Sequence, residues 1–102
     1  MSERLCRLSE IDPGSVLAVD HPHFGRLAIY HTEEGVFATQ DLCTHGNASL
    51  ADGWLEGTEI ECPLHAGRFC VKSGRPTEAP AEKPLKIFKV EVENDWIAVS
   101  QV

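Results

Sequence analysis

Two short stretches, Cys43-Thr44-His45 and Cys62-Pro63-Leu64-His65, decide how this chain is interpreted. Each stretch pairs one thiol with one imidazole, and sixteen residues separate the two. Deprotonated thiols and neutral imidazoles are the ligands that iron and zinc prefer in proteins. A glycine follows each pair and lets the backbone approach a bound group closely. The two stretches therefore predict one metal site with two sulfur and two nitrogen ligands.

The order of these four candidate ligands separates two kinds of site. Cys/His paired with Cys/His fits two irons held asymmetrically, with sulfur ligands on one and nitrogen ligands on the other, as in a Rieske-type [2Fe–2S] centre. A tetrahedral zinc site is the alternative, because zinc accepts the same ligands and stabilises many small domains. Zinc fingers usually group Cys with Cys and His with His, whereas this chain alternates them. The alternation favours the iron–sulfur centre and electron transfer.

Outside the two motifs the chain is predicted to form short strands between turns. Phe88, Val90 and Val92 alternate with charged residues, which is typical of a half-buried strand. Asn94-Asp95 then predicts a two-residue hairpin loop with positive φ angles, leading into a strand over residues 96–100. Further strands are expected at residues 15–19, 26–31, 36–39, 59–61 and 68–71. Since no sustained apolar stripe of helical period is present, we expect an all-β fold with little helix.

Length and composition predict a single domain over residues 1–102. The longest apolar run, at residues 16–19, is far shorter than the roughly 20 residues of a membrane-spanning helix. No apolar stretch follows the charges at the N-terminus, so we expect no signal peptide and a cytoplasmic location. Residues 41–80 are rich in Gly, Pro, His and Cys and are predicted to form the cluster-binding region, since loops on a rigid scaffold often carry function.

The net charge of −7 argues against a nucleic-acid partner, which would require a basic surface. It suits protein partners with basic docking surfaces, because opposite charges accelerate their encounter. The simpler alternative is that the acidic balance only aids solubility. Reduction of a cluster with two thiolate ligands would add one further negative charge.

Other residues that often carry chemistry are expected to be structural. Cys6 and Cys70 lie in alternating apolar stretches, which favours small buried side chains. Four cysteines allow three disulfide pairings, but a reducing compartment makes a metal site the better interpretation. No nucleophile elbow or phosphate-binding loop is present, so we expect no enzymatic activity from this chain alone. The remaining histidines are expected at solvent-exposed positions and the tryptophans in core or loop packing: His21, His23, His31, Trp54 and Trp96.

Residues 42–46 (LCTHG) and 61–69 (ECPLHAGRF) resemble the Rieske family, and more narrowly the small ferredoxins of bacterial aromatic-ring-hydroxylating dioxygenase systems. The resemblance extends over nearly the whole chain. It implies stacked antiparallel sheets with two ligand loops at one tip of a cluster-binding subdomain. It also implies one [2Fe–2S] cluster, with Cys43 and Cys62 on one iron and His45 and His65 on the other, nearer the surface. A proline-bearing third loop covers the cluster in this family, and Ala79-Pro80 is the matching stretch.

Four positions depart from the high-potential Rieske proteins of respiratory complexes. Those proteins join their ligand loops by a disulfide, whereas the matching positions here are Ala48 and Leu64. They also place serine and tyrosine hydroxyls against the cluster sulfurs, whereas this chain has Gly67 and Phe69. Hydrogen bonds to the sulfurs stabilise the more negative reduced state, so their loss lowers the potential. We therefore predict a midpoint of roughly −150 mV rather than roughly +300 mV.

The resemblance implies a one-electron carrier between an NAD(P)H-dependent flavoprotein reductase and a terminal oxygenase. The outer nitrogens of His45 and His65 are then the expected points of electron transfer, with Leu64, Ala66 and Pro80 as an apolar docking patch. A small Rieske subunit of a nitrite reductase is one alternative, although its members often lack the ligands. The detached N-terminal domain of an oxygenase large subunit is another.

Overall fold

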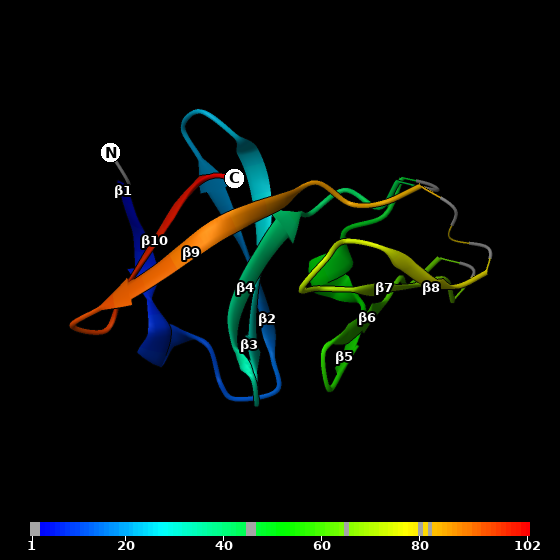
Figure 1. Cartoon of the computed structure of the whole chain (residues 1–102), viewed down its shortest axis with the longest axis horizontal. Coiled ribbons are helices and arrows are strands. Elements are labelled where there is room, and N and C mark those ends of the chain that lie inside the picture. Colours follow the sequence, from blue (N-terminus) through cyan, green and yellow to red (C-terminus); the bar gives the residue numbers. More distant parts are fainter. Residues whose placement is uncertain (1–2, 45–46, 65, 80, 82) are drawn as a thin grey trace.

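The computed structural model describes residues 3–44, 47–64, 66–79, 81 and 83–102, and this part of the chain is almost entirely antiparallel sheet (Figure 1). Two single-turn 3₁₀ helices, η1 (Leu8–Glu10) and η2 (Leu50–Asp52), are its helical elements. The all-β prediction is therefore confirmed. The strands are β1 (Glu3–Arg7), β2 (Val16–His21), β3 (Gly25–Thr32), β4 (Gly35–Gln40), β5 (Trp54–Glu56), β6 (Glu59–Glu61), β7 (Arg68–Cys70), β8 (Pro76–Glu78), β9 (Ile87–Glu93) and β10 (Trp96–Gln101).

The strands form two sheets. One has six strands in the order β1-β10-β9-β4-β3-β2, and the other has four in the order β5-β6-β7-β8. Ala38 of β4 pairs with Phe88 of β9, so residues 41–86 leave the larger sheet and return to it. Figure 1 shows the smaller sheet on the right, at the opposite end of the molecule from β1 and β10. The chain thus places its motif-bearing segment outside the larger sheet.

Strand β3 connects the cores of the two sheets. Its residues Leu27 and Ile29 pack into the core of the six-stranded sheet. Ala28 and Tyr30, on the opposite face of the same strand, pack against residues of the four-stranded sheet. All four side chains are fully buried, which explains why this strand is apolar on both faces.

Most predicted strands are present, and the missed ones lie at sheet edges. The hairpin at Asn94 and Asp95 is confirmed, with φ angles of 51° and 68°. On β9, however, Phe88 is buried while Val92 is exposed, so only the part of the strand near β4 faces the core. Strands β1, β5 and β8 were not predicted. Each is an edge strand of three to five residues, where pairing on one side places little demand on the sequence pattern.

Four side chains differ from the prediction in how deeply they are buried. His21 is buried rather than exposed, because its Nδ1 accepts hydrogen bonds from the backbone N–H groups of the next turn and its ring stacks on Phe24 at 4.2 Å. His31 is half-buried, with Nδ1 2.9 Å from the Ile11 carbonyl oxygen. Trp54 is exposed and Cys70 only half-buried, since both lie on the outer side of the smaller sheet.

The burial predicted for the other cysteine, histidine and tryptophan residues outside the two motifs is confirmed. Cys6 is buried, His23 is exposed, and Trp96 packs beneath the Arg7 guanidinium, whose carbon lies 4.5 Å from the ring centre. Within the described residues, no helix is long and apolar enough to cross a membrane.

Candidate metal centre

Cys43 and Cys62 each stand at the base of a short loop. The backbone N–H of Cys43 donates to the Ala48 carbonyl at 3.0 Å and closes the first loop, residues 43–48. The N–H of Cys62 donates to the Gly67 carbonyl at 2.8 Å and closes the second, residues 62–67. The predicted ligands His45 and His65 belong to these loops but lie outside the described residues. The structure therefore places two of the four predicted ligands.

The two thiols are brought together and are both buried. Burial, followed by a hydrogen bond with the Cys43 thiol, raises the pKa of Cys62 to about 11, although the backbone N–H of Leu64 favours the thiolate. Two thiolates side by side in an apolar environment would repel each other unless a cation lay between them. This pair is thus suited to binding iron, which stabilises the deprotonated form of both.

The surroundings of the two thiols are apolar. Phe69 and Ile60 from the smaller sheet, and Leu50 from η2, belong to the same buried cluster as Cys43 and Cys62. Other members are Ala28, Tyr30, Val71, Ala81 and Leu85. Such packing excludes water from the sulfurs and keeps the local dielectric constant low, and both effects influence the potential of a bound cluster.

A third loop lies against both ligand loops. The Thr44 hydroxyl donates to the Lys83 carbonyl at 2.7 Å. At Gly67, a Cβ atom would lie 3.1 Å from both the Cβ and the backbone nitrogen of Ala81. Gly67 therefore accommodates the third loop, a reason that the sequence did not reveal. The matching proline of the resemblance, Pro80, lies outside the described residues.

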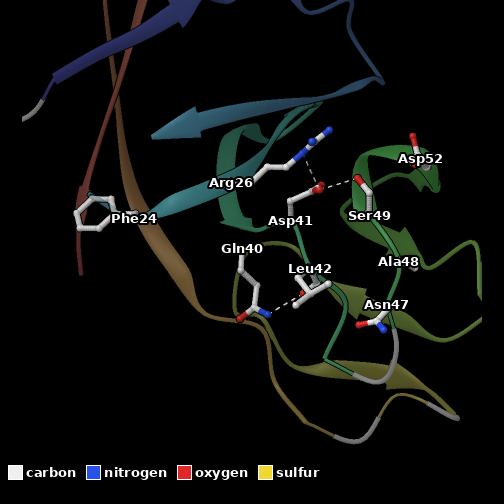
Figure 2. A pocket seen from close by; sticks show the side chains of 9 residues that line it. All are labelled: Phe24, Arg26, Gln40, Asp41, Leu42, Asn47, Ala48, Ser49 and Asp52. Carbon is white, nitrogen blue, oxygen red and sulfur yellow. Dashed lines mark hydrogen bonds and ion pairs between the residues drawn. The ribbon is translucent and has the colours of Figure 1, made fainter. Parts of the chain in front are cut away.

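Asp41, which the sequence analysis did not identify, braces the first loop (Figure 2). The residue is only 2% exposed, and its carboxylate accepts hydrogen bonds from the Ser49 hydroxyl at 2.6 Å and the Ala51 N–H at 3.0 Å. Arg26 Nε lies 3.2 Å from the same carboxylate. The segments before and after loop 43–48 are thus tied together by one side chain. The only sequence signal is an acidic residue two positions before a candidate ligand.

A groove of about 660 Å³ lies beside the Asp41 contacts, with Phe24, Gln40 and Asn47 among its lining residues. Figure 2 shows the Asp41–Ser49 and Asp41–Arg26 contacts along its wall. Its lining does not include Cys43 or Cys62, so it is separate from the thiol pair. Among the described residues, no group of three or more His, Cys, Asp or Glu could hold a metal. The two thiols are the described half of the predicted site.

Comparison with known proteins identifies the family. The profile described as "Rieske [2Fe-2S] domain" matches residues 2–89. This chain belongs to the Rieske [2Fe–2S] family. The Rieske protein accordingly carries one Rieske-type [2Fe–2S] cluster, rather than the alternative zinc ion. The buried, adjacent thiols fit the sulfur-ligated half of such a cluster.

Relatives of the Rieske protein are named as ferredoxin components. It is 40% identical to ferredoxin CarAc of Metapseudomonas resinovorans, covering 95% of this chain and 91% of the relative. It is 48% identical to the ferredoxin component of the naphthalene 1,2-dioxygenase system of Pseudomonas putida, covering 85% of this chain and 83% of the relative. Such components transfer electrons and are not themselves catalysts.

Solved structures are similar over nearly the whole Rieske protein. A chain from the complex of reduced oxygenase and oxidised ferredoxin in carbazole 1,9a-dioxygenase superposes with a TM-score of 0.90 at 39% identity, covering 97% of this chain and 92% of that one. A chain described as a nitrite reductase small subunit gives a TM-score of 0.83 at 25% identity, with 97% of both chains covered. These similarities confirm the predicted Rieske-type fold and favour the dioxygenase ferredoxins over the nitrite reductase subunits.

Proposed function

We propose that this Rieske protein carries single electrons from an NAD(P)H-dependent flavoprotein reductase to a terminal aromatic-ring-hydroxylating dioxygenase. The observation that carries the proposal is the buried Cys43–Cys62 pair, which lies at the base of two loops that a third loop contacts. The ferredoxin components among its relatives support the same role. The structural neighbour in complex with an oxygenase supports the acceptor partner.

The proposed ligands are Cys43 and Cys62 on one iron and His45 and His65 on the other. The two histidines follow their cysteines by two and three residues, which places them beyond the buried loop bases in the chain. When bound, the cluster supplies a site for one electron. The protein's own residues hold the thiols together, exclude water from them and direct the Leu64 N–H at the Cys62 sulfur.

Electron transfer is proposed to occur at the edge formed by the second ligand loop. Leu64 is 38% exposed there, and Ala66 is also exposed with a φ of 60°. A small apolar patch of this kind suits a brief encounter, because weak redox complexes bury little surface. The third member of the predicted patch, Pro80, lies outside the described residues.

Residues 1–102 are proposed to form one domain in the cytoplasm, with residues 41–80 as its cluster-binding region. The family match over residues 2–89 supports one domain, as does the pairing of β1 with β10. No nucleic-acid partner is proposed, given a net charge of −7. No membrane partner is proposed, since the longest apolar run is residues 16–19.

Reconstitution tests the proposal. The purified holoprotein is combined with a flavoprotein reductase, NADH and, separately, the terminal oxygenases of the naphthalene and carbazole systems. We expect substrate-dependent product formation that requires the Rieske protein. His65→Ala should abolish the Rieske EPR signal, whereas Leu64→Glu should retain the signal and slow electron delivery to the oxygenase. If the holoprotein accepts electrons but supports no oxygenase, the proposed function is wrong.

The second candidate is a nitrite reductase subunit, favoured by the structural similarity to such a small subunit. Co-purification with a large reductase subunit in a fixed ratio would support this candidate over the shuttle.

A further inference from the structure

The outer side of the smaller sheet presents a tryptophan among acidic side chains. Cross-strand pairing joins Trp54 to Glu61 and Glu61 to Arg68, and a second row joins Glu56 to Glu59. Paired residues project from the same side of a sheet. The opposite side carries residues of the buried cluster, so this side faces outward. We call Trp54, Glu56, Glu59, Glu61 and Arg68 the outer face.

The outer face is continuous with the proposed electron-transfer edge. Glu61 directly precedes Cys62, and Arg68 directly follows Gly67, so the row nearest the second ligand loop contains both charged residues. The exposed Leu64 belongs to the same loop. Figure 1 shows this sheet at the end of the molecule that is remote from β1 and β10. A partner that reaches the loop can therefore also contact the outer face.

The acidic side chains of this face are partly ordered before any partner binds. Arg68 donates to Glu61 Oε1 through Nε at 3.1 Å and through Nη2 at 3.0 Å. Its guanidinium also lies 3.6 Å from Glu59 and 3.9 Å from Glu56. Three carboxylates against one guanidinium leave the face negative. The Glu56 side chain is 80% exposed, so its charge is available to a basic partner.

Trp54 supplies an apolar anchor beside these charges. It is 61% exposed, and a recess of about 330 Å³ adjoins it between β5 and the segment that leads into β2. Tryptophan contributes strongly to protein interfaces, where its ring fills a recess in the partner. An indole with an acidic rim suits a protein with basic side chains around an apolar depression.

We propose that the outer face docks the terminal oxygenase, which would provide that basic surface; this rests on the proposed function. The choice of the oxygenase follows from charge. A reduced [2Fe–2S] cluster carries one more negative charge than an oxidised one, so a basic partner binds the reduced protein more tightly. An electron acceptor should bind the reduced carrier more tightly than the oxidised one, because it must capture the first and release the second. A reductase should instead bind the oxidised carrier more tightly.

Binding measurements on the holoprotein test the proposal. The dissociation constant is measured anaerobically for the terminal oxygenase that supports the faster turnover in the reconstitution above, at about 20 and about 300 mM NaCl. Trp54→Ala should weaken binding about tenfold. Glu56→Lys should weaken it about tenfold at low salt, and the effect should shrink at high salt. The reduced wild-type protein should bind more tightly than the oxidised protein at low salt.

Glu93→Lys is the matched control for Glu56→Lys. Glu93 is exposed on β9 in the other sheet, and the exchange changes the net charge by the same amount. It should alter binding less than about twofold, because the Debye length is only about 20 Å even at about 20 mM NaCl. The β9–β10 hairpin lies at the other end of a molecule 38 Å long (Figure 1). Unchanged circular dichroism and Rieske EPR spectra establish that each variant is folded and loaded.

Three results would overturn the docking proposal while leaving the electron-carrier function intact. The first is that Trp54→Ala binds the oxygenase as tightly as the wild type does. The second is that Glu56→Lys and Glu93→Lys weaken binding equally. The third is that the oxidised wild-type protein binds the oxygenase more tightly than the reduced protein. Slower reduction by the reductase with unchanged oxygenase affinity would also overturn it, because the face would then serve the donor. Failure of the wild-type holoprotein to bind or support either oxygenase would instead contradict the proposed function.

Discussion

Removal of the Asp41 carboxylate should accelerate loss of the cluster much more than removal of its ion-pair partner. Asp41 accepts two hydrogen bonds, from Ser49 and from the Ala51 N–H, that join the segments on either side of the first ligand loop. If the cluster leaves when this loop opens, both bonds must break. Asp41→Ala removes them beforehand.

The structure sets the expected magnitude. A hydrogen bond to a charged group contributes about 1.5–3 kcal/mol, so two such bonds contribute about 3 kcal/mol at the lower limit. Arg26 is 61% exposed, and its ion pair with Asp41 should contribute at most about 1 kcal/mol because water screens it. Since each 1.4 kcal/mol is tenfold, Asp41→Ala should release the cluster about 100-fold faster, and Arg26→Ala at most about fivefold faster. Asp41→Asn, which keeps one carbonyl oxygen, should fall between them.

Cluster loss is measured as decay of visible absorbance at a fixed guanidinium chloride concentration under anaerobic conditions. A rate is appropriate because proteins that lose a bound cofactor seldom unfold reversibly. Arg26→Ala is the control, since it deletes the ion pair and retains both hydrogen bonds. The reasoning is refuted if Asp41→Ala stays within about fivefold of wild type, or if Arg26→Ala accelerates release as much as Asp41→Ala does.

Three further predictions concern the potential, the cysteines and the smaller sheet. The midpoint potential of the holoprotein should be roughly −150 mV in a potentiometric titration, and a wild-type midpoint well above zero would contradict this. Phe69→Tyr should raise the midpoint potential by about 60 mV for each 1.4 kcal/mol by which the added hydroxyl favours the reduced state. Burial raises the pKa of Cys70, but hydrogen bonds from Ser73 and the nearby Lys72 outweigh this effect and lower the pKa overall. In contrast, burial and the nearby Glu10 raise the pKa of Cys6 to about 11. Iodoacetamide at about pH 8 should therefore label Cys70 before Cys6, as mass spectrometry would show, and Cys70→Ser should remove the early label. Gly53→Ala should destabilise the protein by about 2 kcal/mol or more in denaturant unfolding, because the added Cβ would overlap the Glu61 carbonyl oxygen. An unchanged denaturation midpoint would contradict this prediction.

Features that depend on neighbouring residues were predictable from the sequence. The Asn94-Asp95 hairpin was predicted because these two residue types tolerate positive φ and alternating strands flank them. Strand β6 was predicted with the observed bounds. The edge strands β1 and β5 were missed, since partners on one side only do not impose a strong pattern.

Features that depend on distant residues were not predictable. Asp41 is buried because the chain returns at Ser49 and Ala51, and no local pattern marks it. Trp54 is apolar enough for a core, yet its position on the outer side of a sheet exposes it. His21 is buried because its ring stacks on Phe24, which in turn lies 4.9 Å from Phe88.

The sequence by itself determined the kind of metal site and the strand-rich character of the chain, because ligand type, ligand spacing and alternation are written in adjacent residues. The tertiary structure brings the predicted partners Cys43 and Cys62 together and places a third loop against theirs, and it alone decided that an indole and acidic side chains share one outer surface. These juxtapositions arise from the pairing and packing of segments far apart in the chain, so no single stretch contains the information.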